Sequence, residues 1–209
     1  MASGNSRKYA FNHPFVKLIL ACITIASIYF VFIKAVPKIF LSPESYGDYY
    51  WYRAPWLFIH NLLGMIALIS GPFQLIPSIR KKSWRLHRNM GKIYMVSVIL
   101  ASLTSVYLSY TSAITVTYAL GLFVGSVAWL VTAIIGWVHI RNKKVILHKQ
   151  WMIRNYVVTF FFIIFFGFYD LFRALGFADL IILASALPWV SLLVPLTITE
   201  ILIRKRIIR

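Results

Sequence analysis

The sequence predicts an all-α integral membrane protein, a bundle of six transmembrane helices with both termini in the cytoplasm. The first observation is composition: 60% of the 209 residues are hydrophobic and 13% are charged, whereas a soluble domain is about 45–50% apolar and about 25% charged. The second is a set of apolar segments long enough to cross a bilayer. The third is the placement of basic residues between those segments. Together these observations exclude a water-soluble globule and a disordered chain.

Six segments each hold the roughly 20 mostly apolar residues that a membrane-crossing helix needs. None alternates apolar and polar residues as a barrel strand does, and several exceed strand length. The first follows Arg7 and Lys8, as a signal peptide would, but no small-residue cleavage pattern ends it, so we expect a retained anchor. The expected spans are 16–36, 54–79, 93–113, 115–140, 152–174 and 180–202, within a single transmembrane domain covering 1–209.

The basic residues support this count. With the N-terminus inside, 18 Lys and Arg residues fall on the cytoplasmic side and 4 on the outer side, as the positive-inside rule requires. A net charge of +17 would suggest nucleic-acid binding in a soluble chain. Here the distribution explains the charge, so we expect the lipid bilayer as the surroundings and no nucleic-acid partner.

Ionisable side chains at membrane depth are costly and commonly functional. His87 and His148 lie at the same expected depth at the cytoplasmic ends of two spans. Two imidazoles on different helices are the arrangement of a bis-histidine haem or of a divalent-metal site. Glu200 reaches a similar depth from the last span and is the candidate third metal ligand, with His139 a further possibility. The sequence therefore predicts haem b or a divalent metal at the cytoplasmic face.

The residues around the two histidines fit such a site. On a helix, Gly91 and Tyr94 share the face of the first histidine, and Trp151 follows the second by three positions. The glycine leaves space beside an imidazole. Arg88 and Arg154 are candidates to hold haem propionates through charge-assisted hydrogen bonds.

A simpler interpretation stays open for the same residues. The histidines would be interfacial side chains bonded to carbonyl groups or lipid phosphates, and Glu200 would pair with an arginine. The spacing alone does not separate these interpretations, because no CxxC, HExxH or EF-hand motif accompanies it.

His60 lies deeper, about 10 Å below the expected outer end of the second span. Gly64, Ala67 and Gly71 form a small-residue stripe on its helical face, which permits close helix packing or the edge of a cofactor. No second histidine is expected at this depth, so a haem here would not be bis-histidine.

Asp170 is the expected acidic group near the outer end of the fifth span. We expect it to face the bundle interior and to bond Arg173, Tyr169 or a group on the second span, His60 included. Arg173 lies at i+3, where a helical ion pair is favourable.

Several stretches combine into a recognisable pattern. They are His60, Gly71-Pro72-Phe73-Gln74, His87-Arg88, Gly91-Lys92-Ile93-Tyr94, His148-Lys149-Gln150-Trp151-Met152-Ile153-Arg154-Asn155-Tyr156, Trp189 and Glu200. Together they resemble the DUF2306 family of bacterial polytopic membrane proteins, a family of unknown function, from the second span to the C-terminus. The last span departs from the family, which often has Pro-Asn where this chain reads Trp189-Val190-Ser191-Leu192-Leu193-Val194-Pro195. The resemblance implies a multi-pass protein of the bacterial inner membrane and favours functional roles for His60, His87, His148, Arg154 and Glu200.

The sequence thus favours a small redox-related membrane protein with a haem or metal site at its cytoplasmic face, exchanging electrons with quinone. Two alternatives stay open. One is a non-catalytic accessory subunit or assembly factor that binds other subunits of a larger membrane complex. The other is a zinc-dependent membrane hydrolase, with His87, His148 and Glu200 as ligands and water at the open position.

Overall fold

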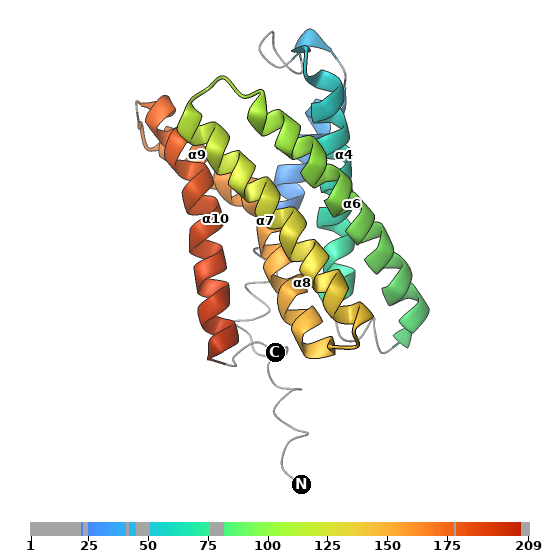
Figure 1. Cartoon of the computed structure of the whole chain (residues 1–209). Coiled ribbons are helices and arrows are strands. Elements are labelled where there is room, and N and C mark those ends of the chain that lie inside the picture. The colour runs from blue at the N-terminus through green and yellow to red at the C-terminus, as the bar shows by residue number, and fades with distance from the viewer. Residues whose placement is uncertain are drawn as a thin grey trace.

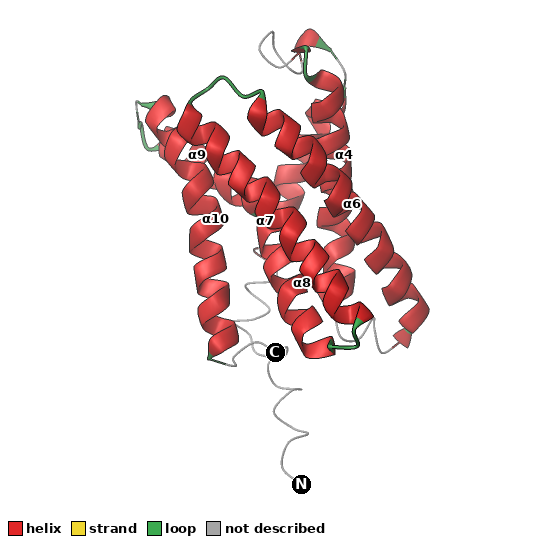
Figure 2. Ribbon diagram, in the orientation of Figure 1, coloured by secondary structure: helices red, strands yellow, loops and turns green. Residues whose placement is uncertain are grey.

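The computed structural model describes residues 22, 25–40, 42–44, 51–75, 82–177 and 179–205. This part of the chain is almost entirely helical and contains no strand (Figures 1 and 2). A short apolar helix, Ile25–Ala35, includes the π-helical turn η1 and leads into the 3-10 helix η2. The elements are η1 (Phe30–Ala35), η2 (Val36–Ile39), α4 (Ala54–Leu75), α6 (Trp84–Tyr110), α7 (Val116–Arg141), α8 (Val145–Thr159), α9 (Phe161–Ala174) and α10 (Leu180–Arg204).

Five helices in the described part of the chain are long and apolar enough to cross a membrane, with α8 and α9 forming one span. The short helix Ile25–Ala35 falls inside the expected first span, most of whose remaining residues lie outside the described ones. The prediction of an all-α membrane bundle is therefore confirmed, with about six helices.

Polar caps set where three of the helices begin. Ser83 accepts a hydrogen bond from the backbone N–H of Leu86 at 3.2 Å, and Thr115 accepts one from Tyr118 at 3.1 Å. Asp179 caps α10 in the same way. With the cap at Ser83, α6 begins at Trp84, whereas the expected third span begins at 93. The capped helix includes the polar residues that precede the apolar segment, and apolar character alone does not predict them as helical.

The expected span 152–174 is interrupted at Phe160, which separates α8 from α9. The backbone N–H of Phe160 donates to the carbonyl of Val157 at 3.1 Å, and the hydroxyl of Thr159 donates to the carbonyl of Asn155, also at 3.1 Å. A threonine hydroxyl bonded to the carbonyl four residues earlier often bends a helix, although the same bond at Thr132 and Thr199 leaves α7 and α10 continuous. The interruption places residues on either side of it against the same internal space.

Small residues allow the helices to approach closely. A Cβ at Gly71 of α4 would overlap the ring of Tyr156 of α8, and one at Gly136 of α7 would lie 2.9 Å from the sulfur of Met152. Close packing of this kind holds transmembrane helices together, since lipid gives little hydrophobic drive for their association. Large apolar side chains along the outside of the helices remain exposed, such as Ile69, Leu103 and Ile182, as expected for surfaces that face lipid.

Candidate functional site

A buried hydrogen-bond network joins α6, α7 and α8 at the centre of the bundle. The hydroxyl of Tyr94 donates to Oδ1 of Asn155 at 2.6 Å and lies 3.0 Å from Oγ1 of Thr159. Thr159 also accepts from the indole N–H of Trp129 at 3.0 Å. The amide of Asn155 donates to the carbonyl of Trp129 and to Oγ1 of Thr132, both at 2.8 Å. Tyr94, expected beside His87, thus lies in the core and bonds α8.

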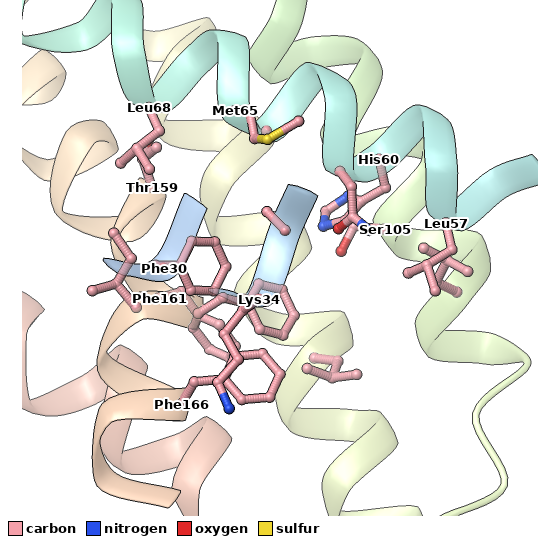
Figure 3. A pocket seen from close by; sticks show the side chains of 18 of the residues that line it. Phe30, Lys34, Leu57, His60, Met65, Leu68, Ser105, Thr159, Phe161 and Phe166 are labelled. Carbon is pink, nitrogen blue, oxygen red and sulfur yellow. The ribbon is translucent and has the colours of Figure 1, made fainter. Parts of the chain in front are cut away.

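A cavity of about 460 Å³ lies next to this network and is lined by residues of α4, α6, α7, α8, α9 and the Ile25–Ala35 helix with the start of η2. Its residues belong to the beginning of α4, the end of α6 and the beginning of α7, so it occupies the half of the bundle near the α6–α7 connection. Figure 3 shows side chains from α4, α9 and the Ile25–Ala35 helix around this shared space. Aromatic and aliphatic groups form most of its lining, among them Phe30, Met65, Leu68, Phe162 and Phe166.

His60 lines this cavity and is 8% exposed. Its Nδ1 lies 3.0 Å from the carbonyl oxygen of Ala101 on α6. Two rings meet it edge-on: Trp129, with centroids 6.3 Å apart at 76°, and Phe162, with centroids 6.0 Å apart at 74°. Because a carbonyl oxygen only accepts, Nδ1 carries the proton in this contact. Its Nε2 makes no hydrogen bond to a described residue, so Nε2 is the ring nitrogen available to a cavity ligand.

The other polar groups of the lining were not singled out from the sequence. Ser105 of α6 and Ser126 of α7 place their hydroxyl oxygens 2.6 Å apart. Arg53 directly precedes α4, lines the cavity and is 1% exposed. Its guanidinium donates a hydrogen bond to the carbonyl of Thr111 at 2.8 Å. Ser105, Ser126 and Thr159 each look unremarkable within their own apolar helices. They line one cavity because three helices turn these positions toward the same space.

The small-residue stripe below His60 divides between two uses. Gly64 lines the cavity, and a Cβ there would meet no atom within 4 Å. Ala67 is fully buried in the core, and Gly71 receives the ring of Tyr156. The upper part of the stripe therefore leaves open space in the cavity, and the lower part allows the expected close packing of helices. A cofactor edge beside the stripe stays a prediction.

Asp170 takes different partners from the expected ones. Its carboxylate lies 2.9 Å from the ammonium of Lys34 and accepts a hydrogen bond of 3.4 Å from the hydroxyl of Tyr29. The prediction of a bond to Arg173, Tyr169 or the second span was wrong, because the Ile25–Ala35 helix packs beside α9 and supplies both partners of this carboxylate. The ammonium of Lys34 also lies 5.4 Å from the ring centroid of Phe166 (Figure 3).

The inner-face histidines lie at the opposite half of the bundle from the cavity. Nδ1 of His148 lies 2.8 Å from the carbonyl oxygen of Gly136, across the α7–α8 turn. The ring of His87 lies 5.3 Å from that of Trp84, one turn earlier on α6. The space beside Gly91 is taken by Gln74 of α4, whose side-chain oxygen would lie 3.0 Å from an added Cβ.

Glu200 is engaged by two arginines. Nε of Arg154 donates to one carboxylate oxygen at 3.1 Å, and Nε of Arg204 donates to the other at 2.8 Å. The guanidinium of Arg154 also lies 4.8 Å from the ring centroid of Trp151. Among the described residues, no three His, Cys, Asp or Glu side chains group closely enough to hold a metal ion. The structure therefore does not assemble His87, His148 and Glu200 into one ligand set, Arg88 is exposed, and a two-histidine site stays a prediction.

The fold and the cavity define a multi-pass α-helical membrane protein with a histidine-bearing cavity inside its bundle. The chain belongs to the family described as "Predicted membrane protein (DUF2306)", whose model matches residues 57–203. The match includes His60 and runs through α10, while the Ile25–Ala35 helix lies before it. No curated protein and no solved structure gives a significant match to the chain.

Proposed function

We propose that this protein binds a lipid-soluble small molecule in its intramembrane cavity and that His60 is the side chain that hydrogen-bonds it. The single observation that carries the proposal is the position of the His60 ring, held by Ala101 on the wall of a cavity of about 460 Å³. Small-molecule sites have volumes of about 300–1,000 Å³ and combine a mostly apolar lining with a few placed polar groups. Ligands dissolved in the bilayer match such a lining.

The surroundings of His60 support binding over a purely structural role. A core histidine with only a packing function is expected to bond both ring nitrogens, since an unpaired buried polar group is costly. Here a carbonyl fixes one nitrogen, and two aromatic rings that lie nearly perpendicular to the imidazole hold its plane. A polar group whose own orientation is fixed in this way is suited to recognise a ligand.

The test compares the lipids and small molecules that copurify with the wild-type protein and three variants, using mass spectrometry of organic extracts. His60→Phe removes the hydrogen-bonding nitrogen, and Gly64→Leu fills the cavity at a position where an added Cβ meets open space. Gly167→Leu is the matched control, because Gly167 also has open space beside it but does not line the cavity. We expect one species to be enriched with the wild type and the control and lost from both cavity variants. Identical extracts from all four proteins would contradict the proposal.

A second candidate function is a haem b or divalent-metal site at the inner face, with electron transfer to or from quinone. The observation in its favour is the bond between Nδ1 of His148 and the carbonyl of Gly136. Histidine ligands commonly donate their other nitrogen to a carbonyl or carboxylate, which leaves Nε2 for the metal. His87 would be the second ligand.

Absorption spectroscopy tests this candidate. A Soret band that shifts on dithionite reduction is expected for a haem, whereas stoichiometric zinc in a colourless sample favours the hydrolase alternative. His87→Ala and His148→Ala should each abolish the bound group, and His139→Ala should retain it. A protein with neither haem nor zinc would contradict both, and would favour an accessory subunit or assembly factor.

A further inference from the structure

We propose that the cavity selects a ligand that donates hydrogen bonds: a lipid-soluble aromatic ring with a free hydroxyl group, such as a quinol or an alkylphenol, over the corresponding quinone or methyl ether. This inference rests on the proposed function, because it names the chemical class of the cavity ligand. It follows from the direction of the hydrogen bonds around the cavity.

The first argument is the tautomer of His60. The carbonyl of Ala101 holds the proton on Nδ1, and no described carboxylate contacts the ring to stabilise a second proton. A cationic imidazole in an apolar cavity without such a partner is costly. The neutral ring with its proton on Nδ1 has a lone pair on Nε2. Its free nitrogen is therefore a hydrogen-bond acceptor.

The second argument is the serine pair. The hydroxyl of Ser126 donates its single proton to the carbonyl of Leu122 at 2.7 Å. The 2.6 Å contact between the two serines then requires Ser105 to donate to Ser126. Because its proton is used in this bond, Ser105 can only accept a hydrogen bond from a ligand. Two groups of the lining, one on α4 and one on α6, are thus acceptors without a free proton.

The remaining polar groups near His60 do not reverse this preference. Thr159 donates to the carbonyl of Asn155 and accepts from Trp129, so its proton is also committed. The amide of Asn61 has both donors and an acceptor, so it does not favour a hydrogen-bond donor ligand over an acceptor ligand. Of the cationic donors of the lining, Lys34 is already paired with the carboxylate of Asp170, and Arg53 donates to the carbonyl of Thr111.

The third argument concerns shape. The rings of Trp129 and Phe162 lie nearly perpendicular to the imidazole, and Phe30 and Phe166 line the same space. Aromatic walls favour a flat ring through stacked and edge-to-face contacts. Along α4 the lining runs from Arg53 to Leu68, about 22 Å at 1.5 Å per residue. That length leaves room for an alkyl or prenyl chain in addition to the ring.

The experiment measures the affinity of 4-decylphenol and of its methyl ether, 4-decylanisole, for the full chain in detergent micelles by isothermal titration calorimetry. The two probes share ring and chain and differ only in the hydroxyl proton. We expect wild-type protein to bind the phenol about tenfold more tightly, the effect of about one net hydrogen bond. Gly64→Leu should weaken both probes equally, which separates cavity binding from partition into the micelle.

The variants assign the preference to its acceptors. His60→Phe should remove most of the preference for the phenol while leaving the affinity of the ether unchanged, and Ser105→Ala should remove a smaller part of it. Ser109→Ala is the matched control, because Ser109 is buried on the same helix, bonds the carbonyl of Val106 and does not line the cavity. If His60→Phe does not fold, Ser105→Ala still decides the outcome.

The results distinguish the two proposals. Equal binding of both probes by the wild type, or tighter binding of the ether, would overturn the donor-ligand inference and leave cavity binding intact. Binding of neither probe, together with extracts that do not change in the cavity variants, would overturn the proposed function itself.

Discussion

The ammonium of Lys34 lies 2.9 Å from a carboxylate oxygen of Asp170, so an ion pair fastens the Ile25–Ala35 helix to α9. Both side chains are roughly one-quarter to one-third exposed, at 26% and 32%. This helix also contributes Phe30 to the cavity wall. The ion pair therefore helps to hold in place the part of the cavity wall that this helix forms.

We predict that Asp170→Asn loosens the Ile25–Ala35 helix. Partly exposed ion pairs contribute about 1 kcal/mol or less, so the bundle should stay folded while this helix separates more often from α9. The measurement is the rate of maleimide labelling at Phe30→Cys in a Cys22→Ser background, which should rise.

Two further variants control this prediction. The charge-swapped double variant Lys34→Asp/Asp170→Lys should restore slow labelling, and Arg173→Gln, one turn away on α9, should have no effect. Slow labelling in Asp170→Asn would show that apolar contacts alone hold this helix.

The Tyr94–Asn155 hydrogen bond predicts a loss of stability in Tyr94→Phe. Both residues are almost fully buried, and the substitution leaves Oδ1 of Asn155 without its donor. An unsatisfied buried acceptor costs about 1–3 kcal/mol. Thermal unfolding in detergent should show the loss, and Tyr110→Phe, whose side chain is 89% exposed on the same helix, should not. Equal stability of the two variants would mean that water replaces the tyrosine hydroxyl.

The fold was predictable from sequence because its signals are local. The length and hydropathy of each apolar segment and the charge of each connection predict a helical membrane bundle without reference to neighbouring helices. His60 was identifiable for the same reason, as an ionisable group within a span.

The cavity was not predictable, because it depends on how helices are rotated about their axes. Ser105, Ser126 and Thr159 lie in different helices, and no periodicity within one helix indicates that they line one cavity. The interruption at Phe160 likewise lies within a continuous apolar segment, so apolar periodicity does not reveal it. The identity of Asp170's partner required the position of the Ile25–Ala35 helix relative to α9.

Gly71 should tolerate no side chain. The ring of Tyr156 occupies the position of its Cβ, and the hydroxyl of Tyr156 is fixed by a 3.0 Å bond to the carbonyl of Leu68, so the ring has little freedom to move. Overpacking of this kind costs about 1–3 kcal/mol. We predict a lower unfolding temperature for Gly71→Ala and little change for Gly64→Ala, where an added Cβ meets open space. If Gly64→Ala lowered the unfolding temperature more than Gly71→Ala did, the close contact would lie elsewhere on α4 and not at Gly71.

The orientation of the bundle determines which leaflet the cavity faces, and it provides the last prediction. Of the 22 Lys and Arg residues, 18 fall on one side of the expected topology, and such an excess keeps that side in the cytoplasm. A green fluorescent protein fused after Arg209 should therefore fluoresce, and alkaline phosphatase fused there should be inactive. Alkaline phosphatase inserted in the α6–α7 connection, between Thr111 and Thr115, should be active, since the expected topology puts this connection, at the cavity end of the bundle, on the outer side of the membrane. Activity of the phosphatase fused after Arg209 would show that the topology is the opposite one, with the cavity in the cytoplasmic leaflet.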